Sequence, residues 1–237
     1  MNTIRENIAA IREKMNAAAL AAGRNPEEIQ LCAASKMNDA ERVQYAVQNG
    51  VDCCGENRVQ ELMDKLPKGA YTGKPVRFIG HLQTNKVNKV VGNVELIQSV
   101  DRPELLAAIN KEAVKKGICQ DILLEVNIGN EESKSGYTPE GAMEAAAHMA
   151  DFPGVHLCGL MAIPPISQNP GDNRKYFAQM AQLSVDIAEK KYDNVNMVCL
   201  SMGMSDDFED AIAEGSTMIR VGTAIFGARY YGTIAQK

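Results

Sequence analysis

The chain has 237 residues, 45% of them hydrophobic, and a formal net charge of -5 at pH 7. That length and hydrophobic content suit one large core, so we expect residues 1–237 to form a single domain. Because the charge is negative and no long block of lysine or arginine occurs, the sequence argues against nucleic acid and anionic membranes as partners.

The chain opens with an amphipathic helix, since Ile4, Ile8, Ile11 and Met15 recur at helical spacing on the way to Gly23. Apolar strand-like runs then alternate with helical patterns. The predicted strands cover residues 29–35, 50–54, 76–80, 96–99, 121–128, 155–161, 197–201 and 218–221. The predicted helices between and after them cover residues 39–49, 58–66, 84–91, 102–116, 139–150, 173–191, 206–214 and 223–232.

Strict alternation of strand and helix predicts a parallel sheet. An open, doubly wound sheet is one alternative, but the eight units are evenly spread and no GxGxxG follows the first strand. The pattern therefore favours a closed (β/α)8 barrel with an extra N-terminal helix, a fold for which roughly 250 residues are typical.

Capping and turn residues support these boundaries. Asp101 is placed to cap the helix at residues 102–116, and Thr138 to cap the helix at residues 139–150. Residues 164–173 contain three prolines and several polar residues, which predicts a loop over one mouth of the barrel.

Targeting and metal-binding signals are weak. The N-terminus lacks a basic segment followed by an apolar run, and no stretch approaches about 20 consecutive apolar residues, so we expect a soluble, cytoplasmic protein. No CxxC pair suited to zinc occurs, and no metal site is predicted. We expect reduced, mostly buried thiols at Cys32, Cys53, Cys54, Cys119, Cys158 and Cys199.

The first strand ends at Lys36, at the edge where barrels of this kind build their active sites. An ammonium that leaves an apolar strand is partly desolvated, which lowers its pKa and frees the amine to attack a carbonyl carbon. The alternative is that Lys36 only marks the point where the chain reaches water.

Other strand ends carry polar groups that would surround the same mouth. Asn57 follows the second strand, His81 the third, and Ser201 ends the seventh, while the fifth contains Glu125 and Asn127 near its end. His81 taken alone is as well explained by helix capping or packing. The group together is the stronger indication of a site.

Arg220 lies near the end of the eighth strand between Ile219 and Val221, and alternation would direct it to the opposite face from these two, into the barrel. Beside a pyridine nitrogen, a guanidinium would donate a hydrogen bond and keep that nitrogen unprotonated. A salt bridge that closes the barrel is the alternative role.

Two glycine-containing turns follow the last two strands. Gly222 and Thr223 offer close backbone approach and a hydroxyl, and residues 201–205 form a second wall. Phosphate commonly binds between these two loops of such a barrel. As isolated motifs they are also explained as ordinary turns.

The sequence resembles the pyridoxal-phosphate homeostasis family, which is related to the N-terminal barrel of alanine racemase, over nearly its whole length. The resemblance is carried by residues 34–36, 55–57 with 59–61, 78–83 with 85–86, 126–128, 159–161, 200–207 and 220–227. It departs from the usual family pattern at Cys54 and Arg58, which flank Gly-Glu-Asn, and at residues 37–39 after the lysine.

The resemblance implies a fold-type III barrel that binds pyridoxal 5'-phosphate as an internal aldimine with Lys36. Arg220 would then face the pyridine nitrogen, while the phosphate would be received by Ser201, Gly222 and Thr223. Asn57, His81 and Met202 would line the cofactor.

The leading hypothesis is a protein that stores, buffers or delivers pyridoxal phosphate through a reversible Schiff base, without strong catalytic activity of its own. An arginine at the ring nitrogen weakens the electron sink that most enzymes of this cofactor use. A fold-type III amino-acid racemase is the main alternative, and a Schiff-base aldolase acting on a phosphorylated sugar is another. We expect a monomer that makes transient contact with enzymes dependent on the cofactor.

Overall fold

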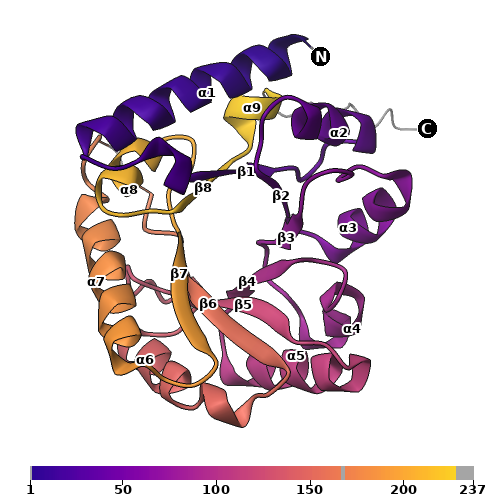
Figure 1. Ribbon diagram of the computed structural model, residues 1–237, viewed down its shortest axis with the longest axis vertical. Coiled ribbons are helices and arrows are strands. Elements are labelled where there is room, and N and C mark those ends of the chain that lie inside the picture. The colour runs from indigo at the N-terminus through magenta and orange to yellow at the C-terminus, as the bar shows by residue number, and fades with distance from the viewer. Residues whose placement is uncertain (1, 167–168, 228–237) are drawn as a thin grey trace.

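The computed structural model describes residues 2–166 and 169–227. Its strands form a closed parallel barrel in which each strand pairs with the next and β8 pairs with β1 (Figure 1). This arrangement confirms the predicted closed barrel and excludes the open sheet. The strands are β1 Gln30–Ala34, β2 Cys53–Glu56, β3 Val76–Phe78, β4 Leu96–Val100, β5 Gln120–Val126, β6 Val155–Ala162, β7 Val195–Ser201 and β8 Met218–Val221.

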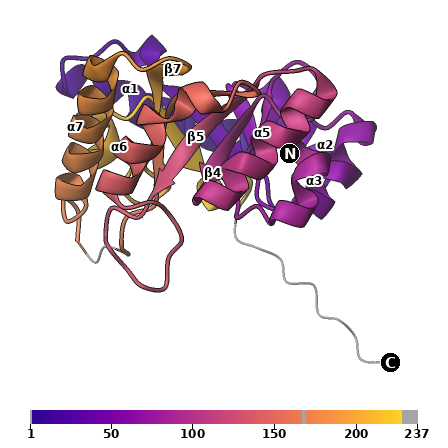
Figure 2. The same cartoon turned by 90° about the horizontal axis from the view of Figure 1, so that it is seen from below.

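Helices surround the barrel, and α5, α6 and α7 stand along its outer face in the side view (Figure 2). The helices are α1 Asn2–Ala21, α2 Ala40–Gln48, α3 Val59–Lys65, α4 Val87–Val90, α5 Pro103–Lys116, α6 Pro139–Ala147, α7 Arg174–Lys190, α8 Phe208–Ala213 and α9 Thr223–Phe226. Among these described helices, none is long and apolar enough to cross a lipid bilayer.

The predicted N-terminal helix completes the outer ring. Helix α9 forms a single turn in the described residues, and α1 lies across that side of the barrel against α8, α9 and α2 (Figure 1). Its buried face is the predicted one, with Ile4, Ile8, Ile11 and Met15 all at most 5% exposed. The part of the predicted last helix beyond residue 227 lies outside the described residues.

The second strand differs from its predicted position. It was expected over residues 50–54, but it begins at Cys53 and continues to Glu56. Gly50 has a φ of +107°, which makes a turn, and the Asp52 carboxylate accepts a hydrogen bond from the Leu31 N–H at 2.7 Å. The strand therefore begins after this turn, and it continues through the buried Glu56, beyond the apolar run on which the prediction was based.

One of the two predicted caps is wrong. Thr138 does cap α6, since its hydroxyl accepts a hydrogen bond from the Gly141 N–H at 3.0 Å. The residue at the start of α5 is instead Arg102, which makes no side-chain capping bond, and Asp101 contacts Arg102 and His81. Residues 164–166 and 169–173 connect β6 to α7 without regular structure, as predicted for this loop.

The main hydrophobic core lies between the strands and the helices. Two smaller clusters centre on thiols and thioethers: one contains Cys158 with Leu96, Leu123 and Met161, and the other contains Cys32, Cys53 and Met218. All six cysteines are free, as expected, but Cys199 is half-buried and Cys119 is exposed at the turn before β5.

Candidate functional site

A cavity of about 680 Å³ opens at the carboxyl ends of the strands. Its volume lies in the range of roughly 300–1,000 Å³ that is usual for small-molecule sites. Five of the eight predicted site residues line it, from the segments that follow β1 and β2, from β8 and from the turn into α9: Lys36, Asn57, Arg220, Gly222 and Thr223. The barrel thus brings together positions that are up to 187 residues apart in the numbering, from Lys36 to Thr223.

Arg220 points into the barrel, as alternation along β8 predicts, and it is held from two sides. Its guanidinium donates hydrogen bonds to the Ser201 carbonyl at 2.7 Å, to the Ser201 Oγ at 2.6 Å and to the Ala162 carbonyl at 2.8 Å. Burial lowers the pKa of Arg220, while Glu125 and Asp207 act in the opposite direction. Because an arginine keeps its proton at neutral pH, the cavity wall presents a fixed hydrogen-bond donor.

Ser201 and Met202 lie deeper than the cavity lining. The Ser201 hydroxyl is buried, donates to Gln98 Oε1 at 2.7 Å and accepts from Arg220, so it orients that guanidinium. Met202 is fully buried and belongs to the main core. The structure does not bring either side chain to the cavity surface, and their contact with a cofactor stays a prediction.

Lys36 lies in a turn that is held by hydrogen bonds on both sides. The preceding Ser35 N–H donates to the Gly55 carbonyl at 2.9 Å. The following Met37 has a φ of +62°, and its N–H donates to Glu61 Oε2 at 2.7 Å. The position of Lys36 is therefore set by β2 and α3 as well as by its own strand.

A buried charged network beneath this turn was not predicted. Glu56 is completely buried, and its Oε1 accepts hydrogen bonds from Ser35 Oγ at 2.5 Å, Lys65 Nζ at 2.9 Å and Tyr71 OH at 2.8 Å. Lys65 also donates to the Ser35 carbonyl at 2.9 Å and to Glu61 Oε2 at 3.1 Å. Burial, followed by the Glu56 charge, raises the pKa of Tyr71 well above its usual range.

The only sequence signal for this network was Glu56 within the Gly-Glu-Asn motif. Lys65 occupies the last turn of a short amphipathic helix, a position where a lysine is normally solvated. Lys65 reaches Glu56 because α3 packs against β2, and Tyr71 reaches it from the segment that follows α3. We infer that the network positions Lys36 through Ser35, Glu61 and the backbone of the turn.

Asn57 offers an unsatisfied polar atom at the cavity. Its side-chain Oδ1 is buried and has no hydrogen-bond partner among the described residues. Close backbone packing fixes its position, because a Cβ at Gly80 would lie 2.2 Å from the Asn57 carbonyl oxygen. A buried oxygen without a partner is unfavourable, and a bound polar molecule would satisfy it.

His81 lines a smaller neighbouring cavity of about 270 Å³, which shares Asn57, Ile79 and Ile163 with the larger one. Its side chain is 55% exposed, and Nδ1 lies 3.1 Å from Asp101 Oδ2. Glu125 lines the same small cavity, and burial, followed by the Asp101 charge, raises its pKa to about 7. The sequence had placed Glu125 near the end of a strand without giving it a role.

Two turns form the opposite wall of the main cavity. Gly222 and Thr223 open α9 beside the first strand, and a Cβ at Gly222 would lie 3.2 Å from the Ala34 carbonyl oxygen. Gly203, with a φ of +92°, lets the other turn pass close to α8, and its carbonyl accepts the Arg220 N–H at 3.0 Å. The first N–H groups of a helical turn lack partners within it and can bind an anion.

The donor set fits the cofactor that the resemblance implies. The cavity combines one amine at Lys36, one cation at Arg220, the unpartnered Asn57 oxygen and a hydroxyl with backbone N–H groups at Thr223. These groups match, in order, an aldehyde, a ring nitrogen, a ring hydroxyl and a phosphate dianion. This match rests on the chemistry of the residues that line the cavity.

Comparison with known proteins agrees with this arrangement. The family model described as "Alanine racemase, N-terminal domain" matches residues 1–230. A curated relative from Aquifex aeolicus (strain VF5), named "Pyridoxal phosphate homeostasis protein", is 42% identical over 226 residues, which cover 95% of this chain and 98% of the relative.

Solved structures give the same picture. PipY of Synechococcus elongatus PCC7942, solved with PLP bound, is 29% identical and superimposes with a TM-score of 0.81, covering 94% of this chain and 100% of PipY. An alanine racemase of Clostridium difficile 630 is 15% identical with a TM-score of 0.69, covering 97% of this chain and 58% of the racemase. At that identity, the racemase shows only that the barrel is shared.

Proposed function

Because the chain belongs to the family of pyridoxal phosphate homeostasis proteins, built on the alanine racemase N-terminal barrel, we propose that it binds pyridoxal 5'-phosphate and takes part in its homeostasis. The observation that carries the proposal is the cavity that unites Lys36, Arg220, Asn57 and the Gly222–Thr223 turn. PipY, which shares the fold over its full length, was solved with the same cofactor.

Each residue has a distinct task in this proposal. The Lys36 amine would hold the cofactor by reversible condensation with its aldehyde carbon, with release of water, and the backbone of the Lys36 turn is held by Glu61 and Gly55. The Arg220 guanidinium, fixed by Ser201, would donate to the ring nitrogen and keep it unprotonated. Gly222 and Thr223 hold the phosphate end.

The linkage is tested by reducing the purified protein with borohydride and mapping the modified peptide by mass spectrometry. We expect visible absorption in the parent protein and, after reduction, a cofactor adduct at Lys36. Lys36→Ala removes both, whereas Lys68→Ala, at an exposed lysine in the short turn after α3, keeps both. An adduct on another lysine in the parent protein would disprove the assignment.

We further propose that the protein carries the cofactor without strong turnover of its own. The named relatives support a homeostatic role, and a guanidinium at the ring nitrogen disfavours strong carbanion stabilisation. The test is chiral analysis of amino acids incubated with the loaded protein. Sustained racemisation that is lost in Lys36→Ala would establish the racemase alternative.

Delivery to enzymes by transient contact is a separate proposal, as are a single domain, a monomeric state and a cytoplasmic location. Transfer is measured by reactivating an enzyme freed of its cofactor, either with the loaded protein or with an equal amount of free cofactor plus a trap. Reactivation that survives the trap supports direct contact, and complete inhibition by the trap contradicts it. Light scattering tests the monomeric state, and a single cooperative unfolding transition tests the single domain.

A further inference from the structure

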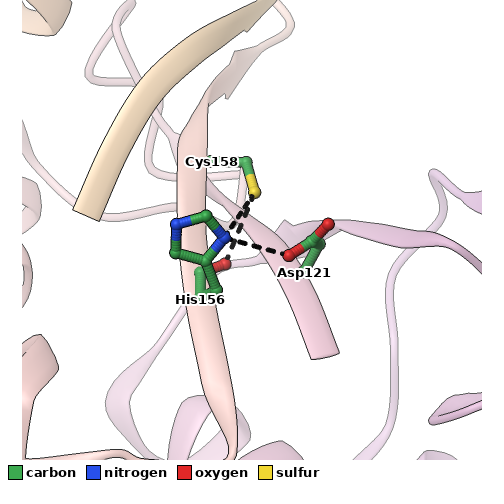
Figure 3. A group of neighbouring side chains, drawn as sticks. All are labelled: Asp121, His156 and Cys158. Carbon is green, nitrogen blue, oxygen red and sulfur yellow. Dashed lines mark hydrogen bonds and ion pairs between the residues drawn. The ribbon is translucent and has the colours of Figure 1, made fainter. Parts of the chain in front are cut away.

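A second cluster of reactive side chains lies at the other end of the barrel, near the amino ends of β5 and β6 (Figure 3). Asp121 is the second residue of β5, and His156 is the second residue of β6. The two are directly paired in the sheet register, and Cys158 follows His156 by two residues. Sheet pairing and strand alternation therefore bring all three side chains to the same place.

The three donor atoms converge on one point. Asp121 Oδ1 lies 3.1 Å from His156 Nδ1, and Cys158 Sγ lies 3.4 Å from the same nitrogen. All three atoms lie within 4.8 Å of one another. Zinc bonds of about 2.0–2.3 Å in a tetrahedron place neighbouring ligand atoms about 3.3–3.7 Å apart, so small side-chain shifts would accommodate the ion.

This convergence is unlike a proton relay. In a nucleophile–histidine–acid relay the nucleophile and the acid contact different ring nitrogens. Here the sulfur and the carboxylate both face Nδ1, and the other ring nitrogen is directed away from both (Figure 3). A single cation would bind all three ligand atoms at once, whereas without it the Cys158 thiol makes only long contacts, to Nδ1 at 3.4 Å and to the His156 carbonyl oxygen at 3.7 Å.

The donor types select the ion. A thiolate and an imidazole favour zinc over magnesium or calcium, which prefer all-oxygen sites. Three protein ligands with one further position open is the arrangement of an open zinc site. We propose that Asp121, His156 and Cys158 form a zinc-binding site with a free coordination position.

A cavity provides room for that position. It measures about 230 Å³ and is lined by Asp121 and Cys158 together with Glu95, Cys199 and Thr217. Arg77 also lines it, but Glu95 forms an ion pair with that guanidinium at 3.0 Å, which offsets its repulsion of a cation. The side chains of Asp121 and His156 are 46% and 36% exposed, so an ion can enter from solvent.

Zinc binding would replace the Cys158 proton and release it to solvent, because the metal ligand is the thiolate. Affinity should therefore rise with pH, and a calorimetric titration in buffers of different ionisation enthalpy will report the released proton. The cluster is at the opposite end of the barrel from Lys36, so binding should not depend on bound pyridoxal phosphate.

The test is titration of the cofactor-loaded protein with Zn²⁺ against a chromophoric chelator, and with Co²⁺ as a spectroscopic substitute. We expect one ion per chain and a thiolate-to-cobalt charge-transfer band. Cys158→Ser should abolish the band, and His156→Gln should weaken Zn²⁺ binding by roughly tenfold or more. Circular dichroism and retained cofactor absorption will show that the variants are folded.

Two matched controls sharpen the result. His148→Gln changes an exposed histidine whose Nδ1 lies 3.5 Å from Asp151 and which does not belong to the Asp121–His156–Cys158 cluster. Cys119→Ser removes the exposed thiol near Asp121. Both should bind Zn²⁺ as the parent does. The proposal is overturned if the parent protein shows no charge-transfer band, or if the band persists in Cys158→Ser or disappears in Cys119→Ser. Equal Zn²⁺ binding in His156→Gln and His148→Gln would overturn it as well.

Discussion

The two ends of the barrel use the same eight strands in different ways. At the carboxyl end, Arg220 is held by the buried Ser201, and Ser35, which precedes Lys36, is held by the buried Glu56 and Lys65. At the amino end, the partly exposed Asp121 and His156 contact each other directly (Figure 3). The first arrangement fixes a reactive group in one orientation, and the second leaves donor atoms open to an incoming ion.

A polar chain along the barrel interior separates these ends. Below Arg220, Ser201 Oγ bonds to Gln98, whose Nε2 donates to Met218 Sδ at 3.1 Å, and Arg77 donates to the same sulfur at 3.1 Å. These bonds join Ser201, Gln98 and Arg77 through the Met218 sulfur. Because the charged partners at the carboxyl end are buried, replacing one of them should lower the free energy of unfolding more than the same replacement in an exposed pair.

The largest effect is expected for Lys65→Met. This change leaves the Glu56 carboxylate buried without its cation, and breaking a buried pair costs about 3–5 kcal/mol of unfolding free energy. The turn at Lys36 should also loosen and retain less cofactor. Urea unfolding and absorption after dialysis are the measurements.

Lys68→Met is the matched control for that substitution. Lys68 pairs with Asp64 at 2.8 Å, but both side chains are more than half exposed. The expected loss is below about 1 kcal/mol, with unchanged cofactor retention. Equal losses in the two variants would remove the proposed difference between the buried network and an exposed pair.

Gly80→Ala should have the next largest effect. The new Cβ would meet the Asn57 backbone at 2.2 Å, so the segment must move, at a cost of about 2–3 kcal/mol. Because Asn57 lines the main cavity, cofactor retention should fall as well. Gly141→Ala, in helix α6, is the comparison: its nearest contact is Thr138 Oγ1 at 3.3 Å, and alanine favours a helix.

Retention in Gly80→Ala is measured by equilibrium dialysis, with unfolding followed in parallel. Normal retention in a destabilised Gly80→Ala would show that Asn57 contributes to the fold and not to the site.

The buried Glu125 should make the free energy of unfolding depend on pH. Its pKa is raised from 4.5 to about 7, so between these values the folded protein holds a proton that the unfolded chain has lost. Stability contributed by this group is therefore present below about pH 4.5, falls as the pH rises and is lost above about pH 7. Relative to Glu125→Gln, the parent should lose up to about 3 kcal/mol across this window, at about 1.4 kcal/mol for each unit of pKa shift.

The measurement is urea unfolding at several pH values for the parent protein, Glu125→Gln and the exposed control Glu132→Gln. Parallel pH curves for the parent and Glu125→Gln would contradict the assignment. If Glu132→Gln differs from the parent in the same way, the difference comes from the change in net charge and not from Glu125.

The smallest effect is expected for His81→Gln. Its side chain is 55% exposed and contacts Asp101 at the smaller cavity, so the change in unfolding free energy should stay below about 1 kcal/mol. Cofactor retention should also remain near that of the parent. Loss of retention by about tenfold in a stable variant would instead place His81 against the cofactor, as the family resemblance implied.

Most of the fold could be predicted because its signals are local. Alternating strand and helix patterns, and the apolar spacing of Ile4, Ile8 and Ile11, reflect the periods of the elements themselves. The second strand was misplaced because its predicted bounds followed the apolar run at residues 50–54, and the burial of Glu56 depends on Lys65 and Tyr71 from later segments. A charged side chain can be buried only where partners neutralise it, and the hydrophobic pattern of the sequence does not reveal those partners.

The sequence predicted which candidate site residues face into the barrel, but not how far below the cavity surface each one lies. Alternation correctly directed Arg220 into the barrel, and Lys36 reaches the cavity as expected. Ser201 also lies inside, yet below the lining, where it binds Arg220 and Gln98. Period-two spacing fixes the side of a strand on which a residue lies, whereas barrel closure and strand stagger fix its height along the axis.

The sequence by itself determined the order of eight strand–helix units, the family, and the polar residues at the strand ends, because each depends on neighbours along the chain. Only the tertiary structure decided that Lys65 lies under the Lys36 turn and that Asp121 meets His156, 35 positions away, beside Cys158. Contacts between strands depend on register and barrel closure, which no local pattern encodes.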